Sequence, residues 1–474
     1  MRARFTILTL WMGALSAQTS PLLQKPEVSG AIEVLDKWIH ATVTEREEPG
    51  LAIGIVYDQN LIWAKGYGFA NLEKQVPTMA STLYRIASIT KVFTATAIMQ
   101  LRDAGKLQLD DPVIKHLPWF QIKEPQPDSP PITIRELLTH SSGLARELPI
   151  PYWNDLKFPS REEMMRLIPE QPAIFPPETK YKYSNLGLAI AGEVVASVSG
   201  EPWSKYIQDH IVAPLGMKST LVIPTPNAPG LAIGYRKRVP GQPREPEDFI
   251  DCGSLAPSAS MASNIQDLAR FVSLQFRDGR PVDRPVLRGS TLREMQRLQW
   301  LRPDGVNGQG LGFGVRLTGA TVRVTKDGAA PGYKSLIEMS IEEKVGVIVL
   351  INGYDADPLL YVDQAFTIVA PAFQKATERP KATPTADPAW SKYVGTYSWK
   401  HVDSEILVVN GELVMLVADA SNPWESRVRL APVAAHTFKM IGGANDGELL
   451  KFDVDENGTA TKFTAASYYR IRKP

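Results

Sequence analysis

The chain has 474 residues, of which 44% are hydrophobic and 22% are charged, and its formal net charge is +1. This composition is typical of a folded globular protein and excludes an intrinsically disordered chain. The length allows one large domain and a smaller one, and the near-neutral charge gives no general attraction to nucleic acid or to an anionic membrane.

The first 17 residues have the pattern of an export signal. Two arginines precede an apolar run at 5–15, and Ala14, Ser16 and Ala17 offer a cleavage site. This run is too short to span a bilayer, and the alternative is an ordinary N-terminal helix. We therefore expect a signal peptide at 1–17, no stable membrane span, and a periplasmic or secreted protein.

Hydrophobic periodicity predicts helices and strands throughout residues 18–378. In chain order, we expect a helix at 32–43, paired strands at 51–57 and 61–67, helices at 88–104, 162–168, 184–198, 202–212, 265–276 and 291–298, strands at 313–317, 321–325, 335–340 and 345–351, and a helix at 361–376. Helices and antiparallel strands around one sheet predict an α+β fold, in which an antiparallel sheet is flanked by helices.

The pattern changes after this large domain. A Pro-rich segment at 379–389 is predicted to be an exposed linker. Beyond it the sequence is β-rich, with Asn410-Gly411 and Asn457-Gly458 as hairpin turns. We expect a small all-β, barrel-like domain at 390–474.

The most informative feature is the Ser-x-x-Lys pair formed by Ser88 and Lys91 at the start of an apolar helical stretch. Residues three apart share a helix face, so the hydroxyl and the amine meet. Desolvation lowers the pKa of a buried lysine, and a neutral amine can accept the serine proton. This is the chemistry of a serine nucleophile that is activated without histidine. Alone, the motif also fits a surface lysine one turn after a helix cap.

A Tyr-Ser-Asn segment opens another apolar helix and supplies Tyr183 and Asn185. If Tyr183 lies between Lys91 and Lys326, its phenolate is favoured electrostatically. Tyr183 would then act as a base on Ser88 and later return the proton to the leaving group. Asn185 would orient a substrate carbonyl. A second Tyr-x-Asn at 152–154 shows that this pattern is not specific by itself.

The third segment, Lys326-Asp327-Gly328, is expected to end a strand before a turn of small residues. The backbone N–H of Ser88, at a helix N-terminus, and an N–H near Ala329 would stabilise a developing oxyanion. The plain alternative is that Lys326 is a solvated charge and that Asp327-Gly328 is an ordinary turn.

Together, the three motifs resemble those of the serine β-lactamase and penicillin-binding-protein superfamily. Longer segments resemble its class C branch, namely 84–91 (YRIASITK), 109–113 (LDDPV), 134–144 (IRELLTHSSGL), 183–187 (YSNLG) and 214–217 (PLGM). The likeness extends from about residue 30 to 376. The C-terminal domain has a weaker resemblance to the lipocalin-like modules of some members.

This resemblance implies a role for each motif residue. Ser88 is the nucleophile, Lys91 and Tyr183 share the duties of base and acid, Asn185 orients the substrate, and Lys326 completes the site. The implied activities of the branch are those of β-lactamases, D-alanyl-D-alanine peptidases, D-amino-acid peptidases and simple esterases.

One departure from the family pattern concerns Asp327. The lactamases have a hydroxyl residue at this position, where it helps to hold the substrate carboxylate. An anion facing the cleft would repel the carboxylate of a β-lactam or a peptide. We therefore expect esters or amides without that carboxylate to be better substrates than β-lactams.

The leading interpretation is an exported serine hydrolase that acts on an ester or amide through an acyl-enzyme. The alternatives are a D-amino-acid-specific cell-wall peptidase or β-lactamase, and a non-catalytic binding protein on the same fold. His140 is expected to be structural, because the chain has no Gly-x-Ser-x-Gly elbow. The six histidines have no metal-ligand spacing, so neither a metal nor a cofactor is expected, and the partner is a small-molecule or peptide substrate.

Overall fold

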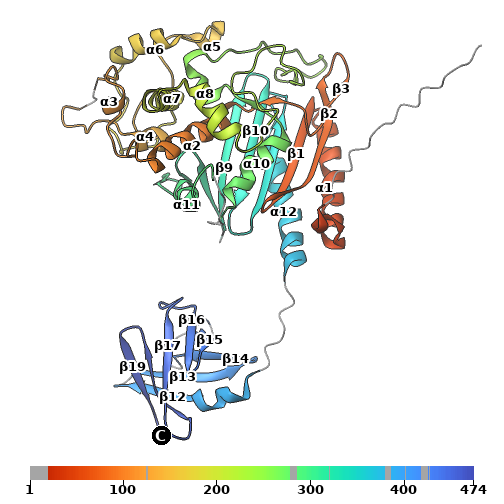
Figure 1. Ribbon diagram of the computed structural model, residues 1–474. Helices are drawn as coiled ribbons and strands as arrows, with labels where there is room; N and C mark the ends of the chain where they lie inside the picture. The colour runs from red at the N-terminus through yellow and green to blue at the C-terminus, as the bar shows by residue number, and fades with distance from the viewer. Residues whose placement is uncertain are drawn as a thin grey trace, which may run out of the picture. The chain divides into compact units, whose positions relative to one another are not determined.

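The computed structural model describes residues 20–474, apart from 124–125, 278–284, 320, 379–385, 401, 418–424 and 426. The expected export signal and residues 379–385 of the expected linker therefore lie outside the described residues. The chain divides into two compact units, one ending at Thr377 and the other beginning at Glu378 (Figure 1).

The first unit is built on a nine-stranded antiparallel sheet, and the predicted α+β fold is confirmed. Across the sheet, the strands are β3 (Val76–Pro77), β2 (Asn60–Asn71), β1 (Gly50–Tyr57), β11 (Val345–Ile351), β10 (Tyr333–Ser340), β9 (Thr321–Ala330), β8 (Gly314–Thr318), β7 (Asn307–Gln309) and β6 (Trp300–Leu301). Two neighbouring strands inside the sheet, β1 and β11, are apolar and almost fully buried. They pair with Ile53 opposite Val349, so their side chains fill both faces of the sheet.

Helices cover both faces of this sheet (Figure 1). On one face, α1 (Pro26–Glu45) and α12 (Pro358–Thr377) pack on alternate side chains of β1, such as Ile53. On the other face, α10 (Ile265–Gln275) lies so close to β1 that a Cβ at Gly54 would be 2.3 Å from Ile265. None of the helices in the described part of the chain is long and apolar enough to cross a membrane.

A helical region on the same side as α10 is centred on α2 (Thr90–Asp103) and α7 (Asn185–Ser199), both almost entirely buried in one hydrophobic cluster. The remaining elements of this unit are α3 (Val113–His116), α4 (Ile134–Thr139), α5 (Tyr152–Asp155), α6 (Arg161–Leu167), α8 (Trp203–Ile207), α9 (Ala256–Ala259), α11 (Gly289–Gln296), the strand pair β4 (Tyr84–Arg85) and β5 (Ala262–Ser263), and short 3-10 or π turns at Pro21–Gln24, Ala87–Ile89, Ile168–Glu170, Gln208–Val212 and Gly253–Leu255.

The local structure of two motifs differs from the sequence-based expectation. Ser88 lies in the 3-10 turn Ala87–Ile89, and the α-helix itself begins at Thr90. The segment 326–328 does not end a strand but lies inside β9, which continues to Ala330. It continues because β10 pairs with it along its length, for example with Asp327 opposite Leu336.

The second unit is a closed eight-stranded barrel, and the expected barrel-like module is confirmed. Each strand pairs with the next along the chain, and β12 pairs with β19 to close the barrel. This is the up-and-down arrangement that lipocalins also have. After a 3-10 helix at Pro388–Tyr393, its strands are β12 (Gly395–Trp399), β13 (Val402–Val409), β14 (Glu412–Leu416), β15 (Val428–Ala434), β16 (Thr437–Ile441), β17 (Leu449–Val454), β18 (Ala460–Ala465) and β19 (Tyr468–Arg472).

The interior of the barrel is filled by side chains. Tyr397, Phe438, Phe452 and Phe463 are all buried, and their rings contact one another. The predicted turn at Asn410-Gly411 joins β13 to β14, and both residues have positive φ, as a tight hairpin turn with this sequence requires.

Candidate active site

Ser88 is held at the junction between β4 and α2. The residue before it, Ala87, has a φ of +45°, a conformation that costs free energy for a residue other than glycine. Tertiary contacts stabilise this turn. The Ile86 N–H donates to the Met261 carbonyl at 2.9 Å, and the Ser335 hydroxyl donates to the Ile86 carbonyl at 3.0 Å. The chain is therefore fixed immediately before the serine.

Two side chains contact the Ser88 hydroxyl. The Lys91 Nζ lies 3.1 Å from the Ser88 Oγ, and the Tyr183 hydroxyl donates to the same oxygen at 2.8 Å. Tyr183 comes from the segment before α7, far away in the sequence. The structure thus places an amine and a phenol within hydrogen-bonding distance of the same serine hydroxyl.

Lys91 is completely buried, and it has two other partners. Its Nζ donates to the Asn185 Oδ1 at 2.7 Å and to the Ser258 carbonyl at 2.8 Å. Burial lowers the pKa of Lys91 to about 7, against the opposing effects of Glu147 and Asp327. A neutral amine has two N–H groups, and those of Lys91 would donate to the Asn185 Oδ1 and to the Ser258 carbonyl. Its lone pair is then directed to Ser88.

A carboxylate that the sequence analysis missed supports Asn185. The Asn185 Nδ2 donates to the Glu147 Oε1 at 2.5 Å, and the Tyr152 hydroxyl donates to the other oxygen of Glu147. Glu147 follows the 134–144 segment, and no local pattern marks it. Tyr152, the tyrosine of the second Tyr-x-Asn, therefore lies behind the site and does not contact Ser88.

Lys326 is buried on β9 and lies beside Tyr183. Its Nζ is 5.5 Å from the centre of the Tyr183 ring, and the Lys91 Nζ is 5.0 Å from the same ring. Burial lowers the pKa of Lys326, whereas the neighbouring Tyr183 and Asp327 oppose this effect. Lys326, together with Lys91 once it has accepted a proton, would stabilise negative charge that develops on the tyrosine oxygen during proton transfer.

One edge of β9, at its C-terminal end, borders the site and is not covered by any other strand that the structure describes. β8 stops opposite Thr325, so residues 326–330 pair with β10 alone among the described strands. Alternate N–H and C=O groups on the other edge remain for a substrate. A Cβ at Gly328 would be 2.2 Å from the Ile86 carbonyl, so only glycine allows β9 to approach the turn that carries Ser88.

A cavity of about 740 Å³ opens over this edge. Ser88, Tyr183, Lys326, Asp327, Gly328 and Ala329 all line it. Asp327 is exposed, so its carboxylate borders the same cavity as the nucleophile. Arg302, which stacks on the Tyr181 ring at 4.1 Å, also lines the cavity and was not expected from the sequence.

His140 lies next to Tyr183, and its side chain forms no hydrogen bond with Ser88 in the described part of the chain. Its Nδ1 accepts a hydrogen bond from the Ser184 N–H at 3.2 Å, and its ring centre is 4.5 Å from that of Tyr183. Burial, together with Lys326 and Lys91, holds the pKa of His140 well below its usual range. The imidazole therefore stays neutral and fixes the backbone that carries Tyr183.

No group of three or more His, Cys, Asp or Glu side chains is arranged to hold a metal ion in the described ranges. The fold, together with the arrangement of serine, lysine and tyrosine around one hydroxyl, is that of the β-lactamase-like, penicillin-binding-protein-like serine hydrolases.

The comparison with protein families gives the same result. The sequence profile of the Beta-lactamase family matches residues 35–366, and the chain belongs to this family. Beta-lactamase-like protein 2 of Dictyostelium discoideum is 27% identical over 432 residues, which cover 85% of this chain and 76% of that protein. Protein flp of Staphylococcus aureus (strain MW2) is 30% identical over 245 residues. They cover 51% of this chain and 48% of that protein, so the match spans about half the length of that relative.

Solved structures share the fold at low sequence identity. The octameric penicillin-binding protein homologue from Pyrococcus abyssi has a TM-score of 0.63 at 24% identity, over 93% of this chain and 100% of that one. EstCE1, a hydrolase with promiscuous acyltransferase activity, has a TM-score of 0.62 at 21% identity, over 72% of this chain and 99% of that one. The β-lactamase/D-alanine carboxypeptidase from Yersinia pestis has a TM-score of 0.60 at 24% identity, over 72% of this chain and 98% of that one.

Proposed function

We propose that this protein is a serine hydrolase that cleaves an ester or amide through an acyl-enzyme on Ser88. The observation that carries the proposal is the contact of the Ser88 Oγ with both the Lys91 Nζ, at 3.1 Å, and the Tyr183 hydroxyl, at 2.8 Å. Two proteins of similar structure, a hydrolase with promiscuous acyltransferase activity and a D-stereospecific amidohydrolase from Streptomyces, support ester or amide substrates.

In the first half-reaction, the Ser88 oxygen attacks the substrate carbonyl, and its proton passes to the neutral amine of Lys91. The backbone N–H groups of Ser88 and Ala329 would stabilise the oxyanion. When the bond to the leaving group breaks, Tyr183 delivers a proton to that group and regains one from Lys91. The products are an ester on Ser88 and a neutral alcohol or amine.

In the second half-reaction, water replaces the leaving group. Lys91 and Tyr183 take a proton from water as the water oxygen bonds to the acyl carbon. The bond between this carbon and the Ser88 oxygen then breaks, and the serine recovers its proton. Asn185 and Lys326 hold the amine and the phenol in place through both steps, Asn185 by its contact with Lys91 at 2.7 Å.

The test is release of p-nitrophenol from p-nitrophenyl butyrate by the protein and by Ser88→Ala. We expect the substitution to lower kcat by at least about 10³-fold. Ser29→Ala, at an exposed serine of α1, is the matched control and should retain full activity. Equal rates for the protein and Ser88→Ala would overturn the proposal and favour a binding protein on this fold.

We also propose that the protein acts outside the cytoplasm, because residues 1–17 have the pattern of an export signal. Expression of the full chain in a bacterium that exports proteins, followed by N-terminal sequencing, tests this. A mature chain in the periplasm or medium that begins near Gln18 supports the proposal. A cytoplasmic chain that retains residues 1–17 contradicts it.

A further inference from the structure

The carboxylate of Glu147 has two hydrogen-bond donors, one on each oxygen. The Asn185 Nδ2 donates to the Oε1, and the Tyr152 hydroxyl donates to the Oε2. The backbone beside Glu147 is fixed independently, because the Arg146 carbonyl accepts a hydrogen bond from the Asn185 N–H at 2.9 Å. The orientation of the carboxylate therefore depends on the contacts of its two oxygens.

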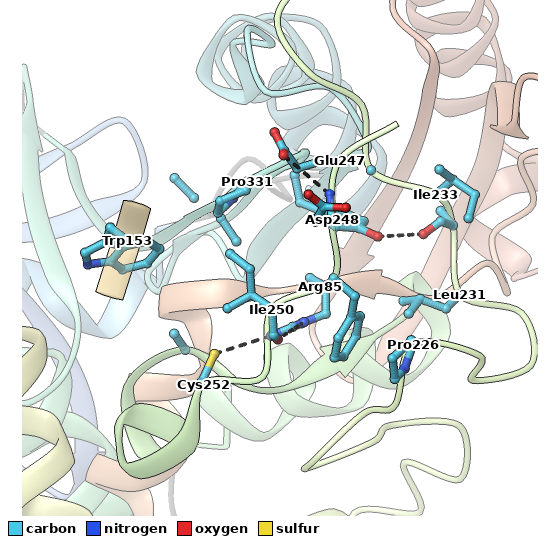
Figure 2. Close-up of a pocket in the computed structure, with 17 residues that line it drawn as sticks. Arg85, Trp153, Pro226, Leu231, Ile233, Glu247, Asp248, Ile250, Cys252 and Pro331 are labelled. Carbon is cyan, nitrogen blue, oxygen red and sulfur yellow. Dashed lines mark hydrogen bonds between the residues drawn. The ribbon is translucent and has the colours of Figure 1, made fainter. Parts of the chain in front are cut away.

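Tyr152 is held firmly enough to act as a fixed donor. It is only 1% exposed, and the centre of its ring is 4.9 Å from that of Phe158. Phe158 packs on the backbone of Gly253, where a Cβ would lie 3.4 Å from the Phe158 side chain. The neighbouring Trp153, whose ring centre is 6.0 Å from that of Tyr152, lines a small pocket together with Cys252 (Figure 2). These ring contacts fix the position of the phenol, and they do not involve its hydroxyl.

The protonation state of Tyr152 also suits this role. Burial and the neighbouring Glu147 hold the pKa of Tyr152 well above its usual range. The phenol therefore stays protonated in the pH range in which Lys91 loses its proton, and it donates to the carboxylate. Hydrogen bonds to a charged acceptor are stronger than those between neutral groups. Tyr152 can thus hold Glu147 without exchanging protons itself.

Arg146 offers Glu147 a competing partner. Its side chain is 64% exposed, and its Nε lies 3.4 Å from the Glu147 Oε1, the oxygen that Asn185 also contacts. Without the bond to Tyr152, rotation of the carboxylate toward Arg146 and water would weaken its contact with Asn185. Because the Asn185 Oδ1 accepts a hydrogen bond from the Lys91 Nζ at 2.7 Å, this rotation would also disturb the amine.

Resting on the function proposed above, we propose that Tyr152 is a positioning residue of the active site, whose hydroxyl holds Glu147 in the orientation that fixes Asn185 and, through it, Lys91. Among the hydrogen bonds of the described residues, none joins Tyr152 to Ser88 or to Lys91. The second Tyr-x-Asn of the chain therefore has a role different from that of Tyr183. It supports the base and does not transfer a proton.

The experiment compares Tyr152→Phe with Tyr67→Phe on p-nitrophenyl butyrate. Tyr67 is a matched control, because it is also buried and its hydroxyl donates to a carboxylate outside the site, that of Asp36, at 2.6 Å. We expect Tyr152→Phe to lower kcat about tenfold at pH 8, the equivalent of one hydrogen bond to a charged group, and to leave KM within about twofold. Tyr67→Phe should retain kcat.

A double-mutant cycle shows whether Tyr152 acts through Glu147. Once Glu147→Ala has removed the carboxylate, Tyr152→Phe should change kcat by less than about twofold. Equal losses in both backgrounds would overturn the proposal, and so would an unchanged kcat in Tyr152→Phe alone. Either result, with hydrolysis that still depends on Ser88, would leave the proposed function intact.

A second measurement does not depend on turnover. The pKa of Lys91 would be determined by NMR with 13C-labelled lysine, and its signal assigned by its loss in Lys91→Met. Glu147 raises this pKa, so its movement away in Tyr152→Phe should lower it, while Asp327, Arg146 and Cys252, which also act on Lys91, remain in place. Tyr67→Phe should leave it unchanged.

An unchanged or higher pKa of Lys91 in Tyr152→Phe would overturn the positioning role. If ester hydrolysis does not depend on Ser88, the proposed function fails, and the NMR titration then decides by itself whether Tyr152 holds Glu147 against Asn185.

Discussion

Asn185 connects Lys91 to the carboxylate of Glu147. Its Oδ1 accepts a hydrogen bond from the Lys91 Nζ at 2.7 Å, and its Nδ2 donates to the Glu147 Oε1 at 2.5 Å. The negative charge of Glu147 raises the pKa of Lys91, against the larger effect of burial, which lowers it to about 7. Glu147 thus raises the pH at which Lys91 becomes a neutral base.

This relationship predicts the pH dependence of the reaction. The neutral amine is the active form, so kcat/KM of the protein should rise with pH through about 7. Glu147→Gln keeps the hydrogen-bonding shape but removes the charge that stabilises the ammonium. We expect the rise in kcat/KM of this variant to occur at lower pH than in the unmodified protein. At pH 8 the kcat/KM values of the two proteins should agree within about tenfold.

The pH–rate profiles of both proteins, measured with p-nitrophenyl butyrate between pH 5 and 9, check this prediction. Glu193→Gln, at a carboxylate that pairs with Arg161 outside the site, is the control and should keep the profile of the unmodified protein. An unchanged or upward-shifted midpoint in Glu147→Gln would show that Glu147 does not act on the charge of Lys91.

Gly328→Ala should disrupt the site while the fold remains. A Cβ at this position would be 2.2 Å from the Ile86 carbonyl and 2.3 Å from the Ser335 hydroxyl, so β9 would have to move away from Ser88. We expect kcat to fall by about 10²-fold or more, because a shift of about 1 Å in a catalytic arrangement has this effect. Gly30→Ala, where a Cβ meets nothing within 4 Å, should retain activity. A fully active Gly328→Ala would contradict the close approach of β9.

Asp327→Thr tests the expectation that an anion in the cleft disfavours β-lactams. The carboxylate is exposed and lines the cavity of Ser88, so its removal should favour a substrate carboxylate there. We expect kcat/KM for nitrocefin to rise by about tenfold or more, while that for p-nitrophenyl butyrate changes little. Unchanged nitrocefin turnover would count against this role of Asp327.

His140 should contribute to stability rather than to proton transfer. Its φ of +58° is unfavourable for a β-branched residue, and its Nδ1 is the acceptor for the buried Ser184 N–H. We expect His140→Val to lower the free energy of unfolding by on the order of 3 kcal/mol. Asparagine tolerates the left-handed conformation and keeps a hydrogen-bond acceptor. His140→Asn should therefore lower the free energy of unfolding much less than His140→Val. Chemical denaturation of the two variants measures these free energies of unfolding. An equal decrease in both variants would contradict the structural role of His140.

The sequence was sufficient for the architecture because the elements that define it have strong local patterns. The apolar runs of β1 and β11 predict strands, and Asn410-Gly411 predicts a hairpin turn in the C-terminal domain, as observed. Local pattern failed where tertiary pairing decides the structure. β9 extends through Lys326 to Ala330 only because β10 pairs with it, and nothing in the small residues 328–330 predicts this extension.

For the site, the spacing of Ser88 and Lys91 predicted that the two side chains face each other, and the resemblance to a family selected Tyr183. The structure brings these residues together with Asn185 and Lys326. Glu147 could not be foreseen, since its importance depends on its contact with Asn185, which is distant in the sequence.

The most direct test of the central claim is to identify the residue that becomes acylated. The protein would be treated with a fluorophosphonate probe, digested, and mapped by mass spectrometry, with Ser88→Ala and Ser29→Ala treated in parallel. The account predicts one covalent adduct, on the peptide that contains Ser88, in the unmodified protein and in Ser29→Ala, and no adduct in Ser88→Ala. An adduct on another residue, or equal labelling of Ser88→Ala, would contradict it.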